Sequence, residues 1–317
     1  MVSYPLFLEY VKDNIISFMP EEYRNYCVEE VQALKENGQV FTGISIVKNE
    51  NGCNPAFYCE GFYKMYQGTQ DIDEVMRFIA EQYVKWDKVG AQMALPDPEN
   101  FEEVKDLIGY SVVNEQLNRD MLKELVHTTV EDLAKVYRVF YMDDDGCKSA
   151  KITNKLMKGW GISIEELDSI ANENMPVLFP PAATEVSKNN SLTLLERIHN
   201  NPEINLAPGG SIYMLTNKYM RGGASVIFYP DLLKTVHAQI QEDFYILPAS
   251  IHEVYILTKE DQSPKHLGEM VRTGNKEFVS PNDVLSDCVY EYIRDSDCIR
   301  KVPESVLQIE KNRGMER

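Results

Sequence analysis

The hydrophobic residues near the start of the chain recur at roughly the spacing of a helix, which places them on one face. One set precedes Pro20 and a second set follows it; the two sets are Leu6, Tyr10, Ile15 and Phe18, then Tyr23, Cys27, Val31 and Leu34. This pattern predicts two amphipathic helices separated by the proline, the second of them ending at Gly38.

The pattern then changes to one that favours strands. Residues 40–47 are rich in β-branched side chains, and residues 57–59 form a second short apolar run. Between them, residues 49–52 end in Asn-Gly, which favours a tight turn because both residues tolerate positive φ. We therefore predict a β-hairpin here, followed by a long amphipathic helix over residues 72–86.

Residues 89–98 are the best candidate for a linker, because two closely spaced prolines cannot continue a helix. We expect an N-terminal α+β domain over residues 1–95, a C-terminal α+β domain over residues 96–300 and a charged tail over residues 301–317. The predicted fold class is α+β: a helical N-terminal region with a β-hairpin, followed by one or more mixed sheets.

Residues 133–142 are apolar on both faces, as is typical of a central strand. They lead into an acidic turn, Asp-Asp-Asp-Gly, at residues 143–146. An EF-hand calcium loop needs alternating oxygen ligands before its glycine and a glutamate after it, and Ile152 stands at the position of that glutamate. We therefore predict a hairpin turn rather than a calcium site.

Two eight-residue segments of the chain resemble each other. Residues 152–159 read Ile-Thr-Asn-Lys-Leu-Met-Lys-Gly, and residues 215–222 read Leu-Thr-Asn-Lys-Tyr-Met-Arg-Gly, with five positions identical. Each segment is followed by a predicted helix and then by an apolar run that meets a proline, at residues 177–180 and 245–248. Both apolar runs are predicted to be strands.

This shared context predicts a duplicated strand-turn-helix-strand unit over residues 130–186 and 205–258, with chance as the alternative explanation. Thr and Asn close turns by bonding to nearby backbone groups, so the matched turns are first interpreted as structural. The alternative is that they bind a ligand. The candidate ligand-binding residues are then Thr153, Asn154, Thr216, Asn217 and Lys218.

Of the five histidines, His252 has the most promising surroundings, because it follows a turn that begins at Pro248. In a hydrolase-type mechanism, His252 would be the general base, Glu253 would orient it, and Ser250 would be the nucleophile. A hydrogen-bonded structural histidine is the alternative interpretation. The His-Glu pair also begins like a zinc-protease motif, but Ile256 stands where the second ligand is required.

Other signatures of catalysis are missing from the sequence. It has no phosphate-binding P-loop, no complete dinucleotide-binding fingerprint, no Gly-x-Ser-x-Gly elbow and no His or Cys pair at metal-ligand spacing. We therefore expect no cofactor and no metal. The formal net charge is −18, from 32 Lys and Arg against 50 Asp and Glu, without a basic run. This charge disfavours nucleic acid and anionic membranes, so the expected partner is another protein.

The sequence also carries an expectation about the compartment. It contains neither a secretion signal nor an apolar stretch of about 18 residues that could span a membrane. The six cysteines include no Cys-x-x-Cys pair and are expected to be reduced thiols. We therefore expect a cytoplasmic protein. The oligomeric state stays open.

Four blocks of the chain resemble one family. They are residues 152–174, residues 213–224, the segment Tyr-Ile-Leu-Pro-Ala-Ser-Ile-His-Glu-Val at residues 245–254, and residues 284–287. In these blocks the chain is similar to an uncharacterised family of clostridial and other gut-Firmicute proteins that is described only as a domain of unknown function. The resemblance extends over about residues 4–292. It implies a bacterial cytoplasmic protein and supplies no activity.

Three functions are compatible with these observations. The absence of catalytic signatures, together with an acidic chain that contains 18 tyrosines, favours an interaction or regulatory protein without catalytic activity. The first alternative is a hydrolase-type enzyme that uses His252 and Glu253. The second is a small-ligand sensor that uses the two Thr-Asn-Lys turns.

Overall fold

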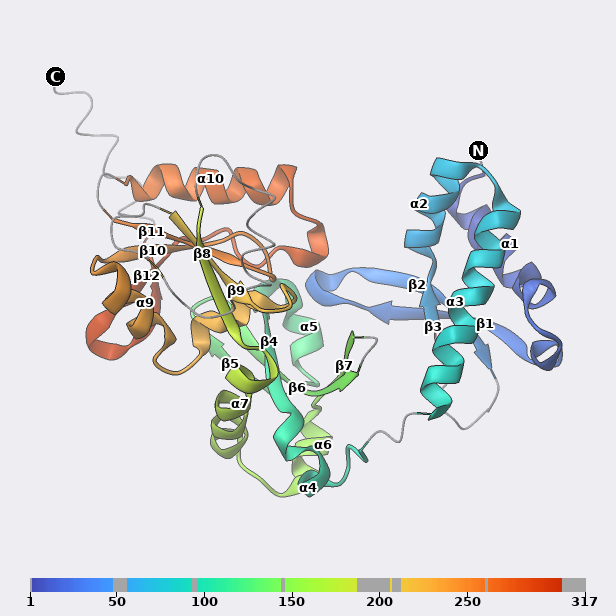
Figure 1. Cartoon of the computed structure of the whole chain (residues 1–317), viewed down its shortest axis with the longest axis horizontal. Coiled ribbons are helices and arrows are strands. Elements are labelled where there is room, and N and C mark those ends of the chain that lie inside the picture. The colour runs from blue at the N-terminus through green and yellow to red at the C-terminus, as the bar shows by residue number, and fades with distance from the viewer. Residues whose placement is uncertain are drawn as a thin grey trace. The chain divides into compact units, whose positions relative to one another are not determined.

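A computed structural model describes residues 2–47, 56–92, 96–143, 146–186, 206, 212–259 and 262–303. The chain divides into two compact units (Figure 1). Unit 1 comprises residues 1–35 and 39–95, and unit 2 comprises residues 36–38 and 96–317. Both units combine helices with antiparallel sheets, which confirms the predicted α+β class.

Unit 1 contains a three-stranded antiparallel sheet in the order β1-β2-β3 and three helices that pack beside it (Figure 1). Its elements are α1 (Tyr4–Phe18), β1 (Cys27–Leu34), β2 (Val40–Val47), β3 (Ala56–Tyr58), α2 (Cys59–Thr69) and α3 (Ile72–Gln92). The core joins Phe7 and Ile15 of α1 to Ile44 of β2, Phe57 of β3 and Tyr83 of α3. The first predicted helix, the predicted hairpin strands and the long helix are thus confirmed; residues 49–52 lie outside the described part.

The second predicted helix, from Tyr23 to Gly38, is wrong. Residues 27–34 form β1, which pairs with β2 along its whole length, from Cys27 opposite Val47 to Leu34 opposite Val40. The helical parts of this region are two short 3₁₀ turns, Glu21–Tyr23 and Glu36–Gly38. In a complete antiparallel ladder, every second residue of the segment forms backbone hydrogen bonds with the neighbouring strand. These hydrogen bonds stabilise the strand, although the apolar spacing of the segment also fits a helix.

Unit 2 contains two antiparallel sheets. The four-stranded sheet has the order β4-β6-β5, with β7 also paired to β6, and the six-stranded sheet has the order β13-β12-β10-β11-β9-β8. The strands are β4 (Ile108–Asn114), β5 (His127–Val130), β6 (Leu133–Asp143), β7 (Gly146–Lys151), β8 (Pro181–Glu185), β9 (Ile212–Asn217), β10 (Phe244–Pro248), β11 (Val254–Thr258), β12 (Tyr290–Ile293) and β13 (Cys298–Lys301).

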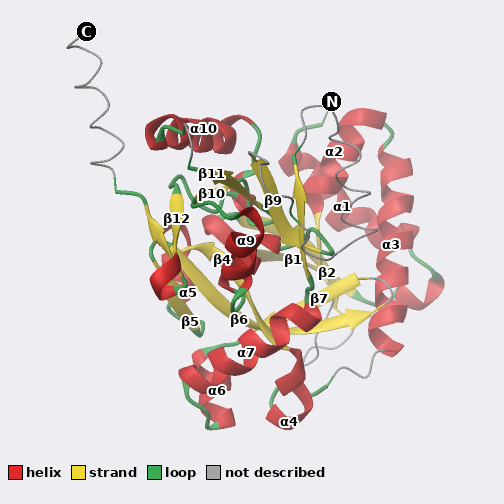
Figure 2. Ribbon diagram, turned by 60° about the vertical axis from the view of Figure 1, so that its left-hand side comes forward, coloured by secondary structure: helices red, strands yellow, loops and turns green. Residues whose placement is uncertain are grey.

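Helices flank these sheets on both sides (Figure 2). They are α4 (Phe101–Val104), α5 (Arg119–Leu122), α6 (Asn154–Trp160), α7 (Ile164–Leu178), α9 (Leu232–Ile240) and α10 (Pro264–Glu277), with short 3₁₀ segments that include η2 (Glu36–Gly38) and η5 (Gly223–Phe228). The six-stranded sheet is buried on both faces. Leu247 and Leu257 pack with α10, whereas Ile246 and Ile256 face the core shared with α9, η5 and the four-stranded sheet.

The predicted central strand is confirmed as β6, which pairs with β4, β5 and β7. Strands β6 and β7 form a hairpin in which Asp143 lies opposite Gly146, and residues 144–145 lie outside the described part. Helix α7 begins after an N-cap, Ser163, whose hydroxyl accepts a hydrogen bond from the Glu166 backbone N–H. The strand predicted at residues 245–248 is confirmed within β10.

The two halves of the predicted duplication differ in structure. In the first matched segment Thr153 is the N-cap of α6, whereas in the second Thr216 and Asn217 end strand β9. The predicted strand at residues 177–180 is wrong, because α7 continues to Leu178 and β8 begins only at Pro181. A proline in the last turn of a helix removes only one backbone hydrogen bond, so Pro176 does not end the helix earlier.

The two halves also differ in their sheets. In the first, β7 and β8 belong to different sheets; in the second, β9 and β10 belong to the same sheet and are separated by β11. The halves therefore share an order of elements without sharing an arrangement. Of the predicted charged tail, residues 304–317 lie outside the described part.

Candidate functional site

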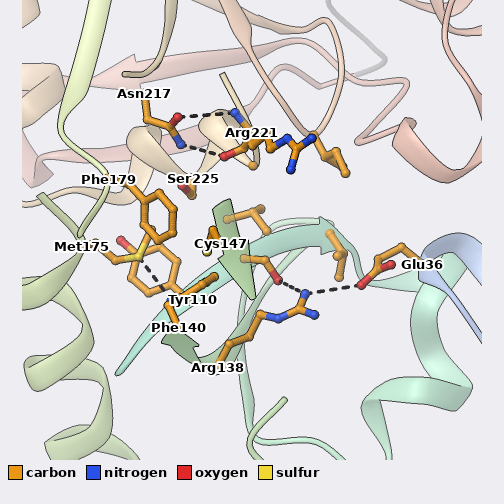
Figure 3. A pocket seen from close by; sticks show the side chains of 15 residues that line it. Glu36, Tyr110, Arg138, Phe140, Cys147, Met175, Phe179, Asn217, Arg221 and Ser225 are labelled. Carbon is orange, nitrogen blue, oxygen red and sulfur yellow. Dashed lines mark hydrogen bonds and ion pairs between the residues drawn. The ribbon is translucent and has the colours of Figure 1, made fainter. Parts of the chain in front are cut away.

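Unit 2 contains a cavity of about 270 Å³ that is open to the surface. It lies among strands β4, β6 and β7, the C-terminal end of α7, the turn that follows β9, and the start of η5 (Figure 3). Figure 3 shows aromatic and sulfur side chains on one side of it and an Arg-Glu pair on the other. The cavity therefore has an apolar side and a charged side.

The apolar wall is built by Phe140, Met175 and Phe179. The rings of Phe140 and Phe179 meet edge to face with centroids 4.8 Å apart. Gly109 of β4 makes this packing possible, since a Cβ atom there would lie 2.7 Å from Met175 Sδ and 3.0 Å from the Phe140 ring. The wall thus depends on one glycine of β4.

The charged side is centred on Arg138 in the middle of β6. Ser111 lies opposite Val136 in the β4–β6 ladder, so Ser111, Arg138 and Phe140 project from the same face of the sheet. The Arg138 Nη1 atom is 3.2 Å from Ser111 Oγ and 3.4 Å from Glu36 Oε1. Lys151 Nζ lies 3.4 Å from the same Glu36 oxygen. One carboxylate oxygen therefore faces two cations.

The charge states of Arg138 and Glu36, on the charged side of the cavity, follow from their burial and from the ion pairs of Glu36 with Arg138 and Lys151. Burial lowers the pKa of Arg138, while Glu36 opposes that change. Burial would also raise the pKa of Glu36, but Lys151 and Arg138 outweigh it and hold this pKa below the ordinary value. Glu36 is therefore ionised at neutral pH and acts as the counter-ion of both cations.

Several buried polar atoms around the cavity lack a hydrogen-bond partner. Among the described residues of unit 2, five side-chain atoms are buried without one. Two of them, Arg138 Nε and Ser225 Oγ, belong to residues that line the cavity. A third, Tyr110 Oη, also belongs to a lining residue, but its side chain projects from the face of β4 opposite to Ser111. An unsatisfied buried polar group costs about 1–3 kcal/mol. Such a concentration of unsatisfied groups is typical of a binding site rather than of a finished core.

The rim of the cavity is the turn after β9. Asn217 organises it, since its Nδ2 donates to Arg221 O at 2.8 Å and its Oδ1 accepts from Tyr219 N at 3.0 Å. Gly222 has a φ of 59°, and its N–H donates to His252 Nδ1 at 3.1 Å. Three predicted site residues thus meet here: Asn217 lines the cavity, His252 binds the turn, and Thr216 Oγ1 donates to His252 O at 2.7 Å.

The predicted Ser-His-Glu arrangement is not formed. The Ser250 hydroxyl donates to Glu253 Oε1 at 2.9 Å and accepts from the His252 backbone N–H, so its proton does not point at an imidazole nitrogen. The His252 ring accepts from Gly222 N, and its Nε2 lies 3.7 Å from Asp283 Oδ1. Glu253 therefore orients Ser250 rather than His252, and these bonds give the loop between β10 and β11 its shape.

The first Thr-Asn-Lys segment lies away from the cavity lining. The Thr153 hydroxyl caps α6 by accepting from Leu156 N at 3.1 Å, and Asn154 Nδ2 donates to Lys123 O at 3.0 Å. In the second segment the side chain of Lys218 is exposed. These three residues have local structural roles or face solvent, and only Asn217 of the five candidates lines the cavity.

Sequence reasoning missed the residues that give the cavity its charge, Glu36 and Arg138. A signal for one of them is present: Arg138 lies in the middle of a strand that is otherwise suited to burial on both faces. For Glu36 no local signal exists, since it lies 102 residues away from Arg138.

Two features are absent from the described ranges. There, no group of three or more His, Cys, Asp or Glu side chains is arranged to hold a metal ion. Within the same ranges, none of the helices combines the length and the apolar character that crossing a membrane requires.

Comparisons with known proteins identify a family. No curated protein and no solved structure matches the chain. The model of one family does match, over residues 4–294, and its description is a family of unknown function, DUF5688. Because the match covers nearly the whole sequence, the chain belongs to the DUF5688 family.

Proposed function

We propose that the protein is a regulatory protein that binds a small molecule in the cavity of unit 2. The observation that carries the proposal is the pair of unsatisfied buried polar atoms, on Arg138 and Ser225, beside a cavity of about 270 Å³. Pockets that bind small molecules combine apolar walls with a few polar groups that fix orientation. The cavity has both features: an apolar wall and a few polar groups among its described residues.

Binding is favoured over catalysis by the chemistry of the lining. Arg138 offers hydrogen-bond donors only. The carboxylate that lines the cavity, Glu36, is held by Arg138 and Lys151. These groups can recognise a ligand, whereas a proton-transfer mechanism needs a base that is free to accept a proton.

Thermal unfolding in the presence of a panel of small metabolites tests the proposal. A ligand that binds the folded protein raises its Tm by mass action. We expect stabilising compounds for the wild-type chain and for Cys298→Phe, in which an exposed cysteine of β13 is replaced. The shift should disappear in Cys147→Phe, whose ring would occupy the cavity from its β7 side. The proposal fails if no compound shifts Tm, or if Cys147→Phe responds like the control.

The same proposal places the protein in the cytoplasm of a bacterium. This location is supported by the resemblance to a bacterial family and by the thiols, since none of the five described cysteines forms a disulfide. A regulatory protein would pass its ligand state to a partner, and the expected partner remains another protein. Cell fractionation of the native host, with detection of the full chain in the soluble cytoplasmic fraction, tests this location.

A further inference from the structure

The cavity has a net positive lining in an acidic chain. Its charged lining residues are Arg138, Arg221 and Glu36, two cations against one carboxylate. The whole chain has a formal net charge of −18. A cavity whose charge opposes that of the chain is suited to an anion, because the ligand gains a local attraction that the surrounding surface does not offer.

The contact between Arg138 and Glu36 leaves the guanidinium only partly used. A carboxylate usually accepts two short parallel hydrogen bonds from arginine, at about 2.7–2.9 Å. Within the described structure the recorded contact is a single one of 3.4 Å, from Nη1 to Oε1, and the buried Nε atom has no partner. Arg138 therefore retains donors that another carboxylate could bind with better geometry.

Glu36 has a second cation available when it leaves Arg138. Its oxygen is equally close to Lys151, at 3.4 Å, so the carboxylate would keep a counter-ion after a ligand had taken its place. The exchange replaces one carboxylate on Arg138 by another and leaves no buried charge unpaired. This avoids the large penalty that normally accompanies the breaking of a buried ion pair.

The apolar wall and the volume restrict the rest of the ligand. Phe140, Met175 and Phe179 present two aromatic rings and a thioether, which favour an apolar or aromatic body. An apolar cavity of ~150 Å³ is enough to hold benzene. A cavity of about 270 Å³ therefore has room for a benzene-sized body together with a carboxylate and a short linker.

We infer that the ligand of this cavity is a small monocarboxylate with an aromatic or other apolar body, whose carboxylate binds Arg138 in place of Glu36. The inference rests on the proposed function, since it names the ligand class of the same cavity. Glu36 is then a built-in competitor that sets the affinity for the carboxylate. A neutral analogue of the same shape does not displace Glu36 from Arg138, so its affinity gains nothing from an ion pair with Arg138.

Calorimetric titration with matched acids and amides tests this inference. The acids run from benzoate through 3-phenylpropionate to 5-phenylvalerate, with hexanoate as the non-aromatic member, and each has its primary amide as the uncharged control. We expect at least one acid to bind the wild-type chain about tenfold more tightly than its amide, because hydrogen bonds to charged groups contribute more than neutral ones. That preference should fall as salt concentration rises.

Two variants distinguish the role of Glu36, which competes with the ligand, from that of Arg138, which binds it. Glu36→Gln removes the competing charge, and we expect it to bind the acid several-fold more tightly while amide binding stays unchanged. The double variant Glu36→Gln with Arg138→Gln removes both charges of the pair together, which limits the loss of stability. In it, the acid should bind no better than the amide.

Specific outcomes would overturn the inference. It fails if the amides bind as well as the acids, or if Glu36→Gln weakens or does not change the binding of the acid. If these acids do not bind but other compounds give shifts that Cys147→Phe abolishes, the ligand class is wrong and the proposed function stands. If no compound of any class gives such a shift, both fail.

Discussion

Unit 2 contains two clusters of polar side chains that differ in how completely their hydrogen bonds are formed. In the first, Asp132 accepts from Ser286 Oγ at 2.8 Å and from Tyr290 Oη at 2.6 Å, while Lys301 Nζ lies 3.7 Å away. In the second, around Arg138, the contact with Glu36 is long and Nε has no partner among the described residues. The Asp132 cluster is complete, and the Arg138 cluster is not.

This difference separates structural polar groups from available ones. Asp132 lies in the turn between β5 and β6, and its two partners precede and begin β12, so the cluster joins the two sheets of unit 2. A complete buried network stabilises one arrangement and resists change. The Arg138 cluster borders the cavity and keeps donors unused, so it can respond to a ligand with a small change in free energy.

The largest effect is expected from breaking the complete cluster. Asp132→Ala leaves the buried hydroxyls of Ser286 and Tyr290 without their acceptor, and we expect the free energy of unfolding to fall by about 3 kcal/mol. Urea denaturation measures this change in the free energy of unfolding. Asp120→Ala removes an exposed carboxylate that pairs with Lys123 at the surface, and should leave the unfolding curve unchanged. Equal effects of the two substitutions would contradict the distinction between the clusters.

A smaller, pH-dependent effect is expected at the Arg138 cluster. Burial opposes ionisation of Glu36, but Lys151 and Arg138 hold its pKa below its ordinary value of 4.5 in the folded state. A carboxyl group with a lowered folded pKa stabilises the fold above the unfolded pKa, and this contribution is lost as pH falls through the folded pKa. At neutral pH the free energy of unfolding of the wild-type chain should therefore be larger than that of Glu36→Gln by on the order of 1 kcal/mol.

Denaturation of both proteins between pH 7 and pH 3 tests the sign. The difference in the free energy of unfolding should be constant down to about pH 5 and should shrink below it, because only there does the carboxyl group begin to take up a proton. A difference that grows as pH falls would show that Glu36 is not the ionised partner of the two cations.

The smallest effect concerns the thiol groups. Cys147 lines the cavity, Cys298 is exposed, and burial raises the pKa of the Cys59 thiol to about 12. A thiol reagent should modify Cys298 readily and Cys59 only after unfolding. A bound ligand should slow the modification of Cys147 several-fold and leave Cys298 unaffected, as followed by peptide mass spectrometry. Unchanged labelling of Cys147 at saturating ligand would place the ligand elsewhere.

Much of the fold can be predicted from local patterns. The long amphipathic helix α3, the central strand β6 and the N-cap at Ser163 each carry a signal within a few neighbouring residues. The errors arise where distant partners decide. Residues 27–34 fit a helix by apolar spacing, yet the ladder with β2 makes them a strand. Residues 177–180 were predicted to be a strand, yet α7 continues to Leu178.

The candidate site could be predicted only in part. Asn217 and His252 were singled out, and both belong to the rim of the cavity or to its support. The charged end could not be found, because it depends on the register that places Arg138 and Ser111 on one face and on a turn 102 residues away in sequence. Spacing along the chain carries no information about such pairs.

Gly109 has a consequence for the evolution of the family. A side chain at this position would press on Met175 and Phe140, so a substitution here requires these two side chains to shift and favours a smaller residue at one of those positions. The three positions should therefore covary among the members of the family. Relatives that have changed them together would have a cavity of different shape, and their sequences alone would then sort the family into groups with different ligands.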